Sequence, residues 1–305
     1  MRPLHVALLG YYGFENTGDE ALLSVLLKYF KEKHPSVSVT VLSKRTNFVA
    51  VFSTLRKTRL LVLGGGSLLQ NATSSFSLYF YLAYIFLAKL LGNSVILLAQ
   101  GIGPIRGRWN QRLAGRVLSL AERITLRDTD SLSLAIRLGV PAHKMEMTAD
   151  LAYLLEPDDA VAEKLSAQKY IGIVPRDFSA FPMASIVDRL RRWVHDTRGE
   201  CVFLPFQPSD VGICETIINQ GIAGKIMIGL TPPQMLAVIS KMDCVLSVRL
   251  HGLILAKLAG VRVEGIVYDP KVQSFLDDPR DLETLKERAK RNLEILSDAL
   301  QKYAR

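Results

Sequence analysis

A short stretch late in the chain combines side chains that can bind an anion and move a proton. The run "SVRLHGL", residues 247–253, follows an apolar, strand-like segment and precedes a helix-like one. On a strand end, Arg249 and His251 would point to the same side. An arginine can bind carboxylate or phosphate through two hydrogen bonds, and a histidine titrates near neutral pH. The pair indicates a catalytic site, although a hydrogen-bonded structural histidine remains the alternative.

A second arginine lies in a similar position earlier in the same half of the chain. The run "GIVPRD", residues 172–177, places Arg176 directly after another apolar, strand-like segment. Arg176 can serve as a second anion anchor, and a surface salt bridge is the competing interpretation. The polar runs "QPSD", residues 207–210, and "YDPK", residues 268–271, follow strand-like segments in the same half.

Three glycine-rich loops mark the first half: "GYYGFENTGDE", "GGGSLLQ" and "AQGIGP". Glycine allows tight turns and a close approach of ligand to backbone. A helix beginning near Asp19 would present N–H groups to an anion. The candidate substrate-binding residues are Gly10, Tyr11, Tyr12, Gly13, Phe14, Asn16 and Asp19 in the first loop, Gly65, Gly66, Ser67, Gln70 and Asn71 in and after the second, and Gln100 and Gly101 in the third.

The spacing in the first loop does not match the common nucleotide fingerprints. Tyr11 and Tyr12 follow Gly10, which breaks G-x-G-x-x-G, and no lysine follows Gly18 as a P-loop requires. The loop therefore suits a small anion or a sugar diphosphate better than a dinucleotide. Its aromatic rings either stack on a substrate or simply pack a tight turn.

Strand-like and helix-like segments alternate along the chain, which predicts an α/β fold with two Rossmann-like, doubly wound domains. We expect an N-terminal domain over residues 1–156, a C-terminal domain over 157–280 and a closing helix over 281–305. Ligands of such sheets bind beyond the carboxyl ends of the strands, so the polar loops should face a cleft between the domains. The predicted strands lie in residues 4–10, 36–43, 58–69, 93–104, 121–128, 143–150, 169–177, 200–210, 243–248 and 261–270.

Composition narrows the class of protein. The chain has 305 residues, 49% of them hydrophobic, and a net charge of +9, which favours a folded protein with an anionic partner. No dense basic run with interleaved aromatics occurs, so nucleic acid is not expected. The apolar stretch 77–91 is short for a membrane span and predicts a buried helix, or alternatively one lying at a membrane interface. Cys201, Cys214 and Cys244 lack metal-ligand spacing and are expected as buried free thiols, and no secretory signal is apparent.

The motifs together resemble one enzyme family. "GYYGFENTGDEA", "GGGSLLQ", "AQGIGP", "LPFQPSD", "VRLHGL" and "YDPKV" occur here in the order seen in polysaccharide pyruvyl transferases, and the bacterial members that modify cell-wall polymers for surface-layer attachment are most similar. The resemblance implies an inverted glycosyltransferase-B-like fold and transfer of pyruvate from phosphoenolpyruvate to a sugar as a cyclic ketal. It also implies a role for Arg176, Arg249 and Lys271. The family usually has aspartate where this chain has Asn71.

The resemblance and the charge lead to a specific expectation. Phosphoenolpyruvate is the donor, and no cofactor or metal is expected. The acceptor is expected to be an N-acetylmannosamine-containing unit on a lipid diphosphate, reached by a cytoplasmic protein bound peripherally to an anionic membrane face. His251 is the expected acid/base group. The alternatives are a nucleotide-sugar-dependent glycosyltransferase of the two-domain B type and a non-catalytic carbohydrate- or phosphate-binding protein.

Overall fold

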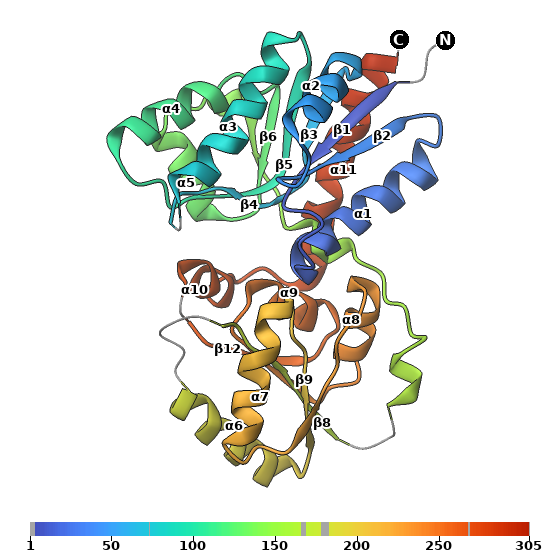
Figure 1. The fold of residues 1–305 in the computed structure, drawn as a ribbon, viewed down its shortest axis with the longest axis vertical. Coiled ribbons are helices and arrows are strands. Elements are labelled where there is room, and N and C mark those ends of the chain that lie inside the picture. The colour runs from blue at the N-terminus through green and yellow to red at the C-terminus, as the bar shows by residue number, and fades with distance from the viewer. Residues whose placement is uncertain (1–3, 73, 166–168, 178–182, 268, 305) are drawn as a thin grey trace. The chain divides into compact units, whose positions relative to one another are not determined.

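The computed structural model describes residues 4–72, 74–165, 169–177, 183–267 and 269–304. The chain folds into two compact units (Figure 1). Each unit contains one parallel β-sheet with helices packed against it, which confirms the predicted α/β class.

The division into units differs from the boundaries expected from the sequence. The first unit comprises the residues up to 13, residues 22–154 and the residues from 283 onward, and the second comprises residues 14–21 and 155–282. Most of the C-terminal helix, expected as a separate element, therefore packs with the first unit. Part of the first glycine-rich loop packs with the second.

The sheet of the first unit has the order β2-β1-β3-β5-β6-β7, and β4 pairs with β5. All the pairings between these described strands are parallel. The central strands are buried on both faces, which explains their unbroken apolar sequences. The strands are β1 (His5–Leu9), β2 (Ser38–Leu42), β3 (Leu60–Leu63), β4 (Gly66–Leu69), β5 (Ser94–Ile102), β6 (Arg123–Leu126) and β7 (Met145–Met147).

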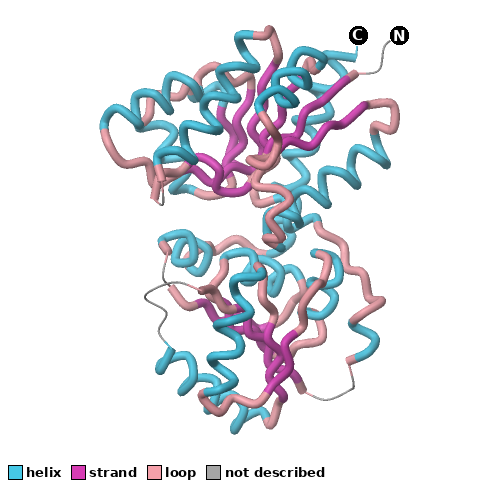
Figure 2. Tube along the Cα trace, in the orientation of Figure 1, coloured by secondary structure: helices cyan, strands magenta, loops and turns pink. Residues whose placement is uncertain are grey.

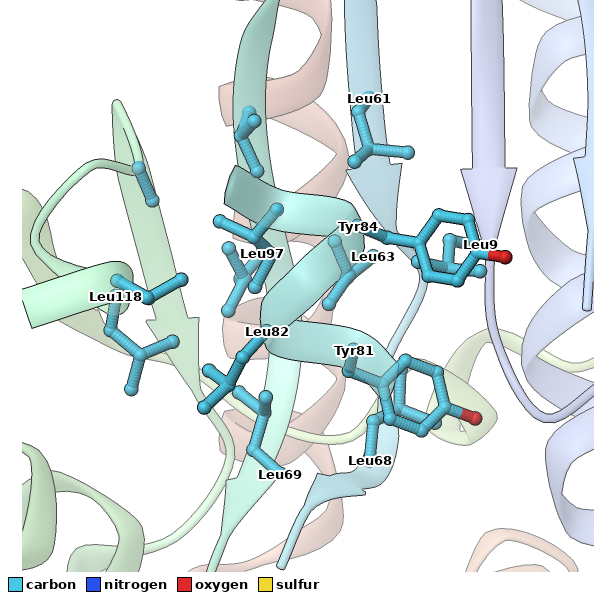
Figure 3. Packing of buried hydrophobic residues seen from close by; sticks show 14 of the residues in the cluster. Leu9, Leu61, Leu63, Leu68, Leu69, Tyr81, Leu82, Tyr84, Leu97 and Leu118 are labelled. Atoms are coloured by element: carbon cyan, nitrogen blue, oxygen red, sulfur yellow. The ribbon is translucent and has the colours of Figure 1, made fainter. Parts of the chain in front are cut away.

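Four helices share one apolar core with this sheet. They are α2 (Phe48–Lys57), α3 (Ser75–Leu90), α4 (Arg108–Leu118) and α5 (Thr129–Arg137). Figure 3 shows α3 laying Tyr81 and Leu82 over the strands that carry Leu63 and Leu97. Buried residues from all four helices and from alternate positions of the strands form this core, so the four helices cover the same face of the sheet.

The long helix α11 (Leu282–Ala304) packs on the opposite face through a buried polar contact. Thr125 alternates with the core residues Ile124 and Leu126 and so points away from them. The Asn292 side chain accepts hydrogen bonds from Thr125, from Thr148 and from the Ala99 N–H, and it donates to the Ala149 carbonyl. Helix α1 (Thr17–Lys33) completes the first unit, except for its first turn.

Ala99 marks an irregularity in β5. Its φ is 46°, and the pairing of β5 with β6 shifts register between Leu97 and Gln100. The Ala99 N–H binds the Thr125 hydroxyl at 2.6 Å and the Asn292 amide oxygen at 3.2 Å instead of a ladder partner. Such a bulge changes where the next side chain points, and here that side chain is Gln100.

The second unit has a parallel sheet with the order β10-β9-β8-β11-β12, drawn in magenta in the lower part of Figure 2. The strands are β8 (Tyr170–Val174), β9 (Glu200–Phe203), β10 (Gly224–Ile226), β11 (Cys244–Ser247) and β12 (Arg262–Gly265). The helices are α6 (Met183–Thr197), α7 (Val211–Asn219), α8 (Pro232–Ile239), α9 (Leu250–Leu258) and α10 (Pro270–Leu276).

The three cysteines are buried free thiols of this second unit, as predicted. Burial raises the pKa of Cys201 and of Cys214 to about 12, and it also raises the pKa of Cys244. A thiol with a raised pKa is a poor nucleophile at neutral pH. These side chains therefore serve packing.

The C-terminal end of α11 generates a prediction about acid stability. Burial raises the pKa of the Glu122 carboxyl, but hydrogen bonds from Lys302, Tyr303 and Ser94 outweigh it and bring the pKa to about 2. The carboxylate therefore stabilises the fold above pH ~4.5, and this contribution is lost as the pH falls toward 2. Because Lys302 is largely exposed, we expect Glu122→Gln to cost only about 1 kcal/mol at pH 7.

Urea unfolding at neutral pH and near pH 3 measures this difference. The gap between wild type and Glu122→Gln should narrow in acid. The control is Glu32→Gln, which removes an exposed ion pair with Lys28. An unchanged gap at the two pH values would show that Glu122 does not couple the helix to the fold through its charge.

Candidate active site

The Asp210 carboxylate organises three loops at the carboxyl end of the second unit's sheet. Asp210 ends a 3₁₀ turn, Pro208–Asp210, after β9, and its side chain is fully buried. One oxygen accepts the N–H groups of Phe206 and Gln207 at 3.2 and 3.0 Å. The other accepts the Asp177 N–H, from the loop after β8, at 3.3 Å. Asp210 thus joins the ends of two neighbouring strands.

The same carboxylate also holds Arg249, at the end of the next strand. The Arg249 Nη2 donates to Asp210 Oδ1 at 2.6 Å and to Gln207 Oε1 at 2.8 Å. The Arg249 Nε is buried and finds no hydrogen-bond acceptor among the residues that the structure describes. A charged donor without an acceptor is suited to binding an anion.

Arg249 and His251 do not lie on a strand, which corrects the argument made from strand alternation. Strand β11 ends at Ser247, Arg249 is the N-cap of α9, and His251 lies in that helix's first turn. The Ser247 hydroxyl fixes the turn by accepting the Arg249 N–H at 3.1 Å and donating to the Arg249 carbonyl at 2.7 Å. Both residues therefore occupy a helix N-terminus, where the free N–H groups favour negative charge.

His251 packs directly against the start of α1. A Cβ placed on Gly18 would overlap the Nδ1, Cγ and Cβ atoms of the imidazole side chain. Nearby, the Thr17 N–H donates to the Phe206 carbonyl at 2.9 Å, which ties the same segment to the loop after β9. The second half of the first glycine-rich loop thus belongs to the same unit as the Arg249–Asp210 pair.

The other candidates near this segment are placed as follows. Asn16 donates a short hydrogen bond to the buried Asp19 carboxylate, and Phe14 is half-buried. Arg176 is half-buried and precedes Asp177, whose N–H binds Asp210. Lys271 follows β12 in the first turn of α10, and its N–H is capped by Asp269. Tyr268 of the same motif lies outside the described residues.

The first unit gathers a different set of candidates at the carboxyl end of its own sheet. Tyr12 is buried, and its ring fills the space that side chains on Gly10 and Gly64 would need. Tyr11 packs against the core, with the Lys44 ammonium 5.8 Å from its ring centre. Gly10 therefore accommodates the protein's own Tyr12 ring, and Gly13 (φ 75°) forms the turn that follows.

A buried arginine lies against residues of both the second and the third glycine-rich loop. Arg127 donates to Asp150 at 2.6 Å and to Ser67 at 2.8 Å. A Cβ on Gly101 would lie 2.8 Å from an Arg127 nitrogen and 2.9 Å from the Ser67 hydroxyl, so a larger residue there would force these side chains to move. Arg127 and Asp150 were not among the predicted site residues, although both lie at the ends of the predicted strand segments 121–128 and 143–150.

Gln100 lies at this same edge with part of its amide unused. The side chain is fully buried, and its nitrogen donates to the Leu63 and Leu98 carbonyls at 3.2 and 3.1 Å. Its oxygen meets no hydrogen-bond donor in the described part of the chain. Gly65 and Gly66 both have positive φ and form the turn from β3 into β4. The Gln70 side chain instead accepts the Ala72 N–H.

Asn71 uses both ends of its amide to hold the third loop. The Asn71 oxygen accepts the Arg106 N–H at 2.7 Å, and its nitrogen donates to the Arg106 carbonyl at 2.9 Å. A carboxylate could make only the first of these bonds, since it has no donor when ionised. Asparagine at this position therefore serves to join two loops.

Within the residues that the structure describes, no three His, Cys, Asp or Glu side chains group closely enough to hold a metal ion. Across the same described parts of the chain, no helix combines the length and apolar character needed to cross a membrane.

Comparison with known proteins identifies the sequence family and the fold separately. A family model described as polysaccharide pyruvyl transferase matches residues 16–270. A search of the curated proteins finds no match. The match spans both units and includes most of the candidate residues.

Solved structures share the fold at low sequence identity. A UDP complex of MnaA from S. aureus has a TM-score of 0.65 and 13% identity, and the match covers 99% of this chain and 97% of that chain. UDP-GlcNAc 2-epimerase from Neisseria meningitidis, solved with UDP-GlcNAc, has a TM-score of 0.63 and 12% identity, with 96% and 99% covered. HepE from Anabaena, solved with UDP and glucose, has a TM-score of 0.56 and 11% identity, with 99% of each chain covered. These similarities confirm a glycosyltransferase-B-like fold with two Rossmann-like domains.

The contact between Gly18 and His251 generates a test of the local geometry. We expect Gly18→Ala to lower the free energy of unfolding by roughly 1–3 kcal/mol, because the new Cβ would meet the base of the imidazole side chain. Gly212→Ala, in α7, is the matched control, since a Cβ there meets no atom of the described chain within 4 Å. The control should be neutral or stabilising by up to about 1 kcal/mol. Thermal unfolding measures both, and equal stability of Gly18→Ala and wild type would contradict the packing described.

Proposed function

The chain belongs to the polysaccharide pyruvyl transferase family, and we propose that it transfers pyruvate from phosphoenolpyruvate to two hydroxyls of a sugar, forming a cyclic ketal and releasing phosphate. The observation that carries the proposal is the Arg249–Asp210 pair, which leaves a buried cationic donor with no acceptor in the described chain. Family membership supports the transferase activity, and this geometry supports an anionic donor.

Phosphoenolpyruvate carries a carboxylate and a phosphate on one small carbon frame, so it needs closely spaced anion anchors. Arg249 offers its Nε–H, and Arg176 follows the adjacent strand β8. The N-terminus of α9 adds backbone N–H groups and the positive end of the helix dipole. Lys271 follows β12, the strand on the other side of β11. The proposed donor site therefore lies wholly within the second unit.

The proposed chemistry begins with protonation of the methylene carbon of phosphoenolpyruvate. The C=C π electrons form the new C–H bond, and one sugar hydroxyl attacks the central carbon and loses its proton. The C–O bond to phosphate then breaks, and a second hydroxyl forms the second C–O bond and loses its proton. One acid/base group can supply the first proton and recover one of the two released, and phosphate takes the other. We assign this role to His251, which lies two residues after Arg249 in the first turn of α9.

The proposed acceptor is a saccharide that contains N-acetylmannosamine on a lipid diphosphate. A lipid-linked acceptor places the reaction at the cytoplasmic face of an anionic membrane, where a net charge of +9 favours peripheral binding.

A nucleotide-sugar-dependent glycosyltransferase is the second candidate. The neighbours of similar fold include structures solved with UDP, UDP-GlcNAc or UDP and glucose. At 11–13% identity this similarity concerns the fold alone. A glycosyltransferase should add a sugar from UDP-GlcNAc to the acceptor, whereas a pyruvyl transferase should consume phosphoenolpyruvate. Mass spectrometry of the acceptor separates the two products.

The test uses purified protein, phosphoenolpyruvate and a synthetic saccharide-diphosphate lipid carrying N-acetylmannosamine. Wild type should release phosphate and form the ketal. We expect His251→Ala to lower kcat by about 10²-fold or more, because protonation of carbon loses its acid. Arg249→Ala should lower kcat/KM by a similar factor, since it removes an anchor of the donor's negative charge.

The matched controls lie on exposed parts of the same unit. His195→Ala and Arg191→Ala remove exposed side chains of α6 and should leave turnover unchanged. His251→Asn keeps a polar side chain beside Gly18 and guards against misfolding of the alanine variant. Near-normal ketal formation by a folded His251 or Arg249 variant would contradict the role assigned to that residue.

A further inference from the structure

The positive charge of this protein is concentrated in one stretch of the chain. Residues 33–121 contain eleven of the 38 Lys and Arg and none of the 29 Asp and Glu, so the remainder of the chain is slightly acidic. The stretch forms α2, α3, α4 and the strands between them, and these three helices cover one face of the first unit's sheet. The acid-free stretch therefore supplies these three neighbouring helices.

Helix α3 is apolar on its buried side and on its solvent side. It buries residues such as Leu78, Tyr81 and Ile85 in the core. Its only charged residue is Lys89. A helix that is apolar all round is ordinarily covered by protein or lipid. The exposed side carries an apolar stripe at intervals of three and four residues: Phe76, Tyr79, Ala83, Phe86 and Leu90.

The two neighbouring helices extend this surface with aromatic and basic side chains. Helix α4 contacts α3, and the Tyr79 hydroxyl donates to the Asn110 side chain between them. Lys44, just before α2, donates to Ser77 in the first turn of α3. Figure 1 shows α2, α3 and α4 beside one another in front of the sheet of the first unit. We call the exposed residues of these three helices together the α2–α4 face.

The exposed residues of the α2–α4 face combine the two features of a membrane-binding surface. All six exposed aromatic side chains among the described residues lie here: Phe48, Phe52, Phe76, Tyr79, Phe86 and Trp109. Trp109 is 68% exposed and Phe76 is 73% exposed. The exposed cations of the three helices are Arg56 and Lys57 on α2 and Arg108, Arg112 and Arg116, one turn apart, on α4.

We propose that the α2–α4 face binds an anionic lipid bilayer, with the α3 stripe entering the interface and the α4 arginines meeting the headgroups. Exposed apolar stripes flanked by Lys and Arg partition into the headgroup–acyl boundary, where aromatic rings are favoured. Each cation near an anionic leaflet adds to the binding. This inference rests on the proposed function in one respect: membrane binding would bring the protein to a lipid-linked acceptor.

Charge decides between a bilayer and a second copy of the chain. A two-fold contact through this face would set the same acid-free, basic surface against itself. No carboxylate within residues 33–121 could offset that repulsion. An anionic bilayer supplies the complementary charge and the apolar interior together. A dimer through this face is therefore the outcome that would overturn the proposal.

The experiment is flotation of the full-length protein with vesicles of phosphatidylcholine alone or with about 30% phosphatidylglycerol. Wild type should float with the anionic vesicles at low salt and much less at high salt, because screening weakens the electrostatic part. Arg108→Gln/Arg112→Gln/Arg116→Gln should lower the partition coefficient about tenfold or more. Phe76→Ser/Phe86→Ser/Leu90→Ser should lower it similarly, and this loss should persist at every salt concentration that still gives binding.

Matched controls remove the same kinds of side chain from the second unit. Arg192→Gln/Arg198→Gln/Lys241→Gln removes three exposed cations, and Ile228→Ser removes a 67% exposed apolar side chain. Both should float like wild type. Thermal unfolding and calorimetric titration with phosphoenolpyruvate report whether each variant keeps its fold and its donor site.

The results separate this proposal from the proposed function. Flotation uses no substrate, so a protein that binds vesicles but not phosphoenolpyruvate would support the surface and contradict the donor site. Equal flotation of wild type and both α2–α4 face variants would contradict the proposal that this face binds the bilayer. A wild-type dimer in light scattering that the Phe76/Phe86/Leu90 variant dissociates would overturn it as well, by showing that a second copy covers the face.

Discussion

The second unit depends on one buried carboxylate, that of Asp210. A fully buried negative charge is tolerated only when it is paired and hydrogen-bonded, because desolvation costs several kcal/mol. Here three backbone N–H groups and the Arg249 guanidinium satisfy it. Those partners belong to three features of the sheet edge: the loop after β8, the turn after β9 and the cap of α9. Removing the carboxylate would release all three and leave Arg249 buried without its counter-ion.

The glycines show how closely these loops are packed. The sequence predicts that the glycines let a ligand approach the backbone closely. The structure shows that side chains of the protein itself occupy the space beside several of these glycines. His251 lies against Gly18, Arg127 against Gly101, and Tyr12 against Gly10. The glycines therefore allow side chains of the protein to approach the backbone closely.

The fold was largely predictable because its signals are local and repeated. Apolar runs ending in glycine or polar loops mark parallel strands, and β1, β3, β5, β8 and β11 all lie within the predicted segments. Helix α2 was not predicted, because its sequence "FVAVFSTLRK" contains Val and Phe in a pattern that also suits a strand. The bulge at Ala99 depends on tertiary contacts with Asn292 and Thr125, which no local pattern contains.

The candidate site was predictable in its residue types and less so in its connections. Arg249 and His251 stand out because a cation and a proton carrier follow one strand. Asp210 was visible only as the last residue of a polar run, since its role depends on residues 33 to 39 positions away. Asn71 occupies a position where the related family usually has aspartate. Its two hydrogen bonds to Arg106 join two loops, and the sequence alone did not show these bonds.

A crystal structure with bound phosphoenolpyruvate tests most directly whether the Asp210-held Arg249 is the donor anchor. The account predicts a phosphate or carboxylate oxygen of the ligand about 2.7–2.9 Å from the Arg249 Nε, as in other charge-assisted hydrogen bonds. It also predicts that the Arg249–Asp210 bond stays intact. Phosphoenolpyruvate bound elsewhere, with the Arg249 Nε still without an acceptor from the ligand, would contradict the account.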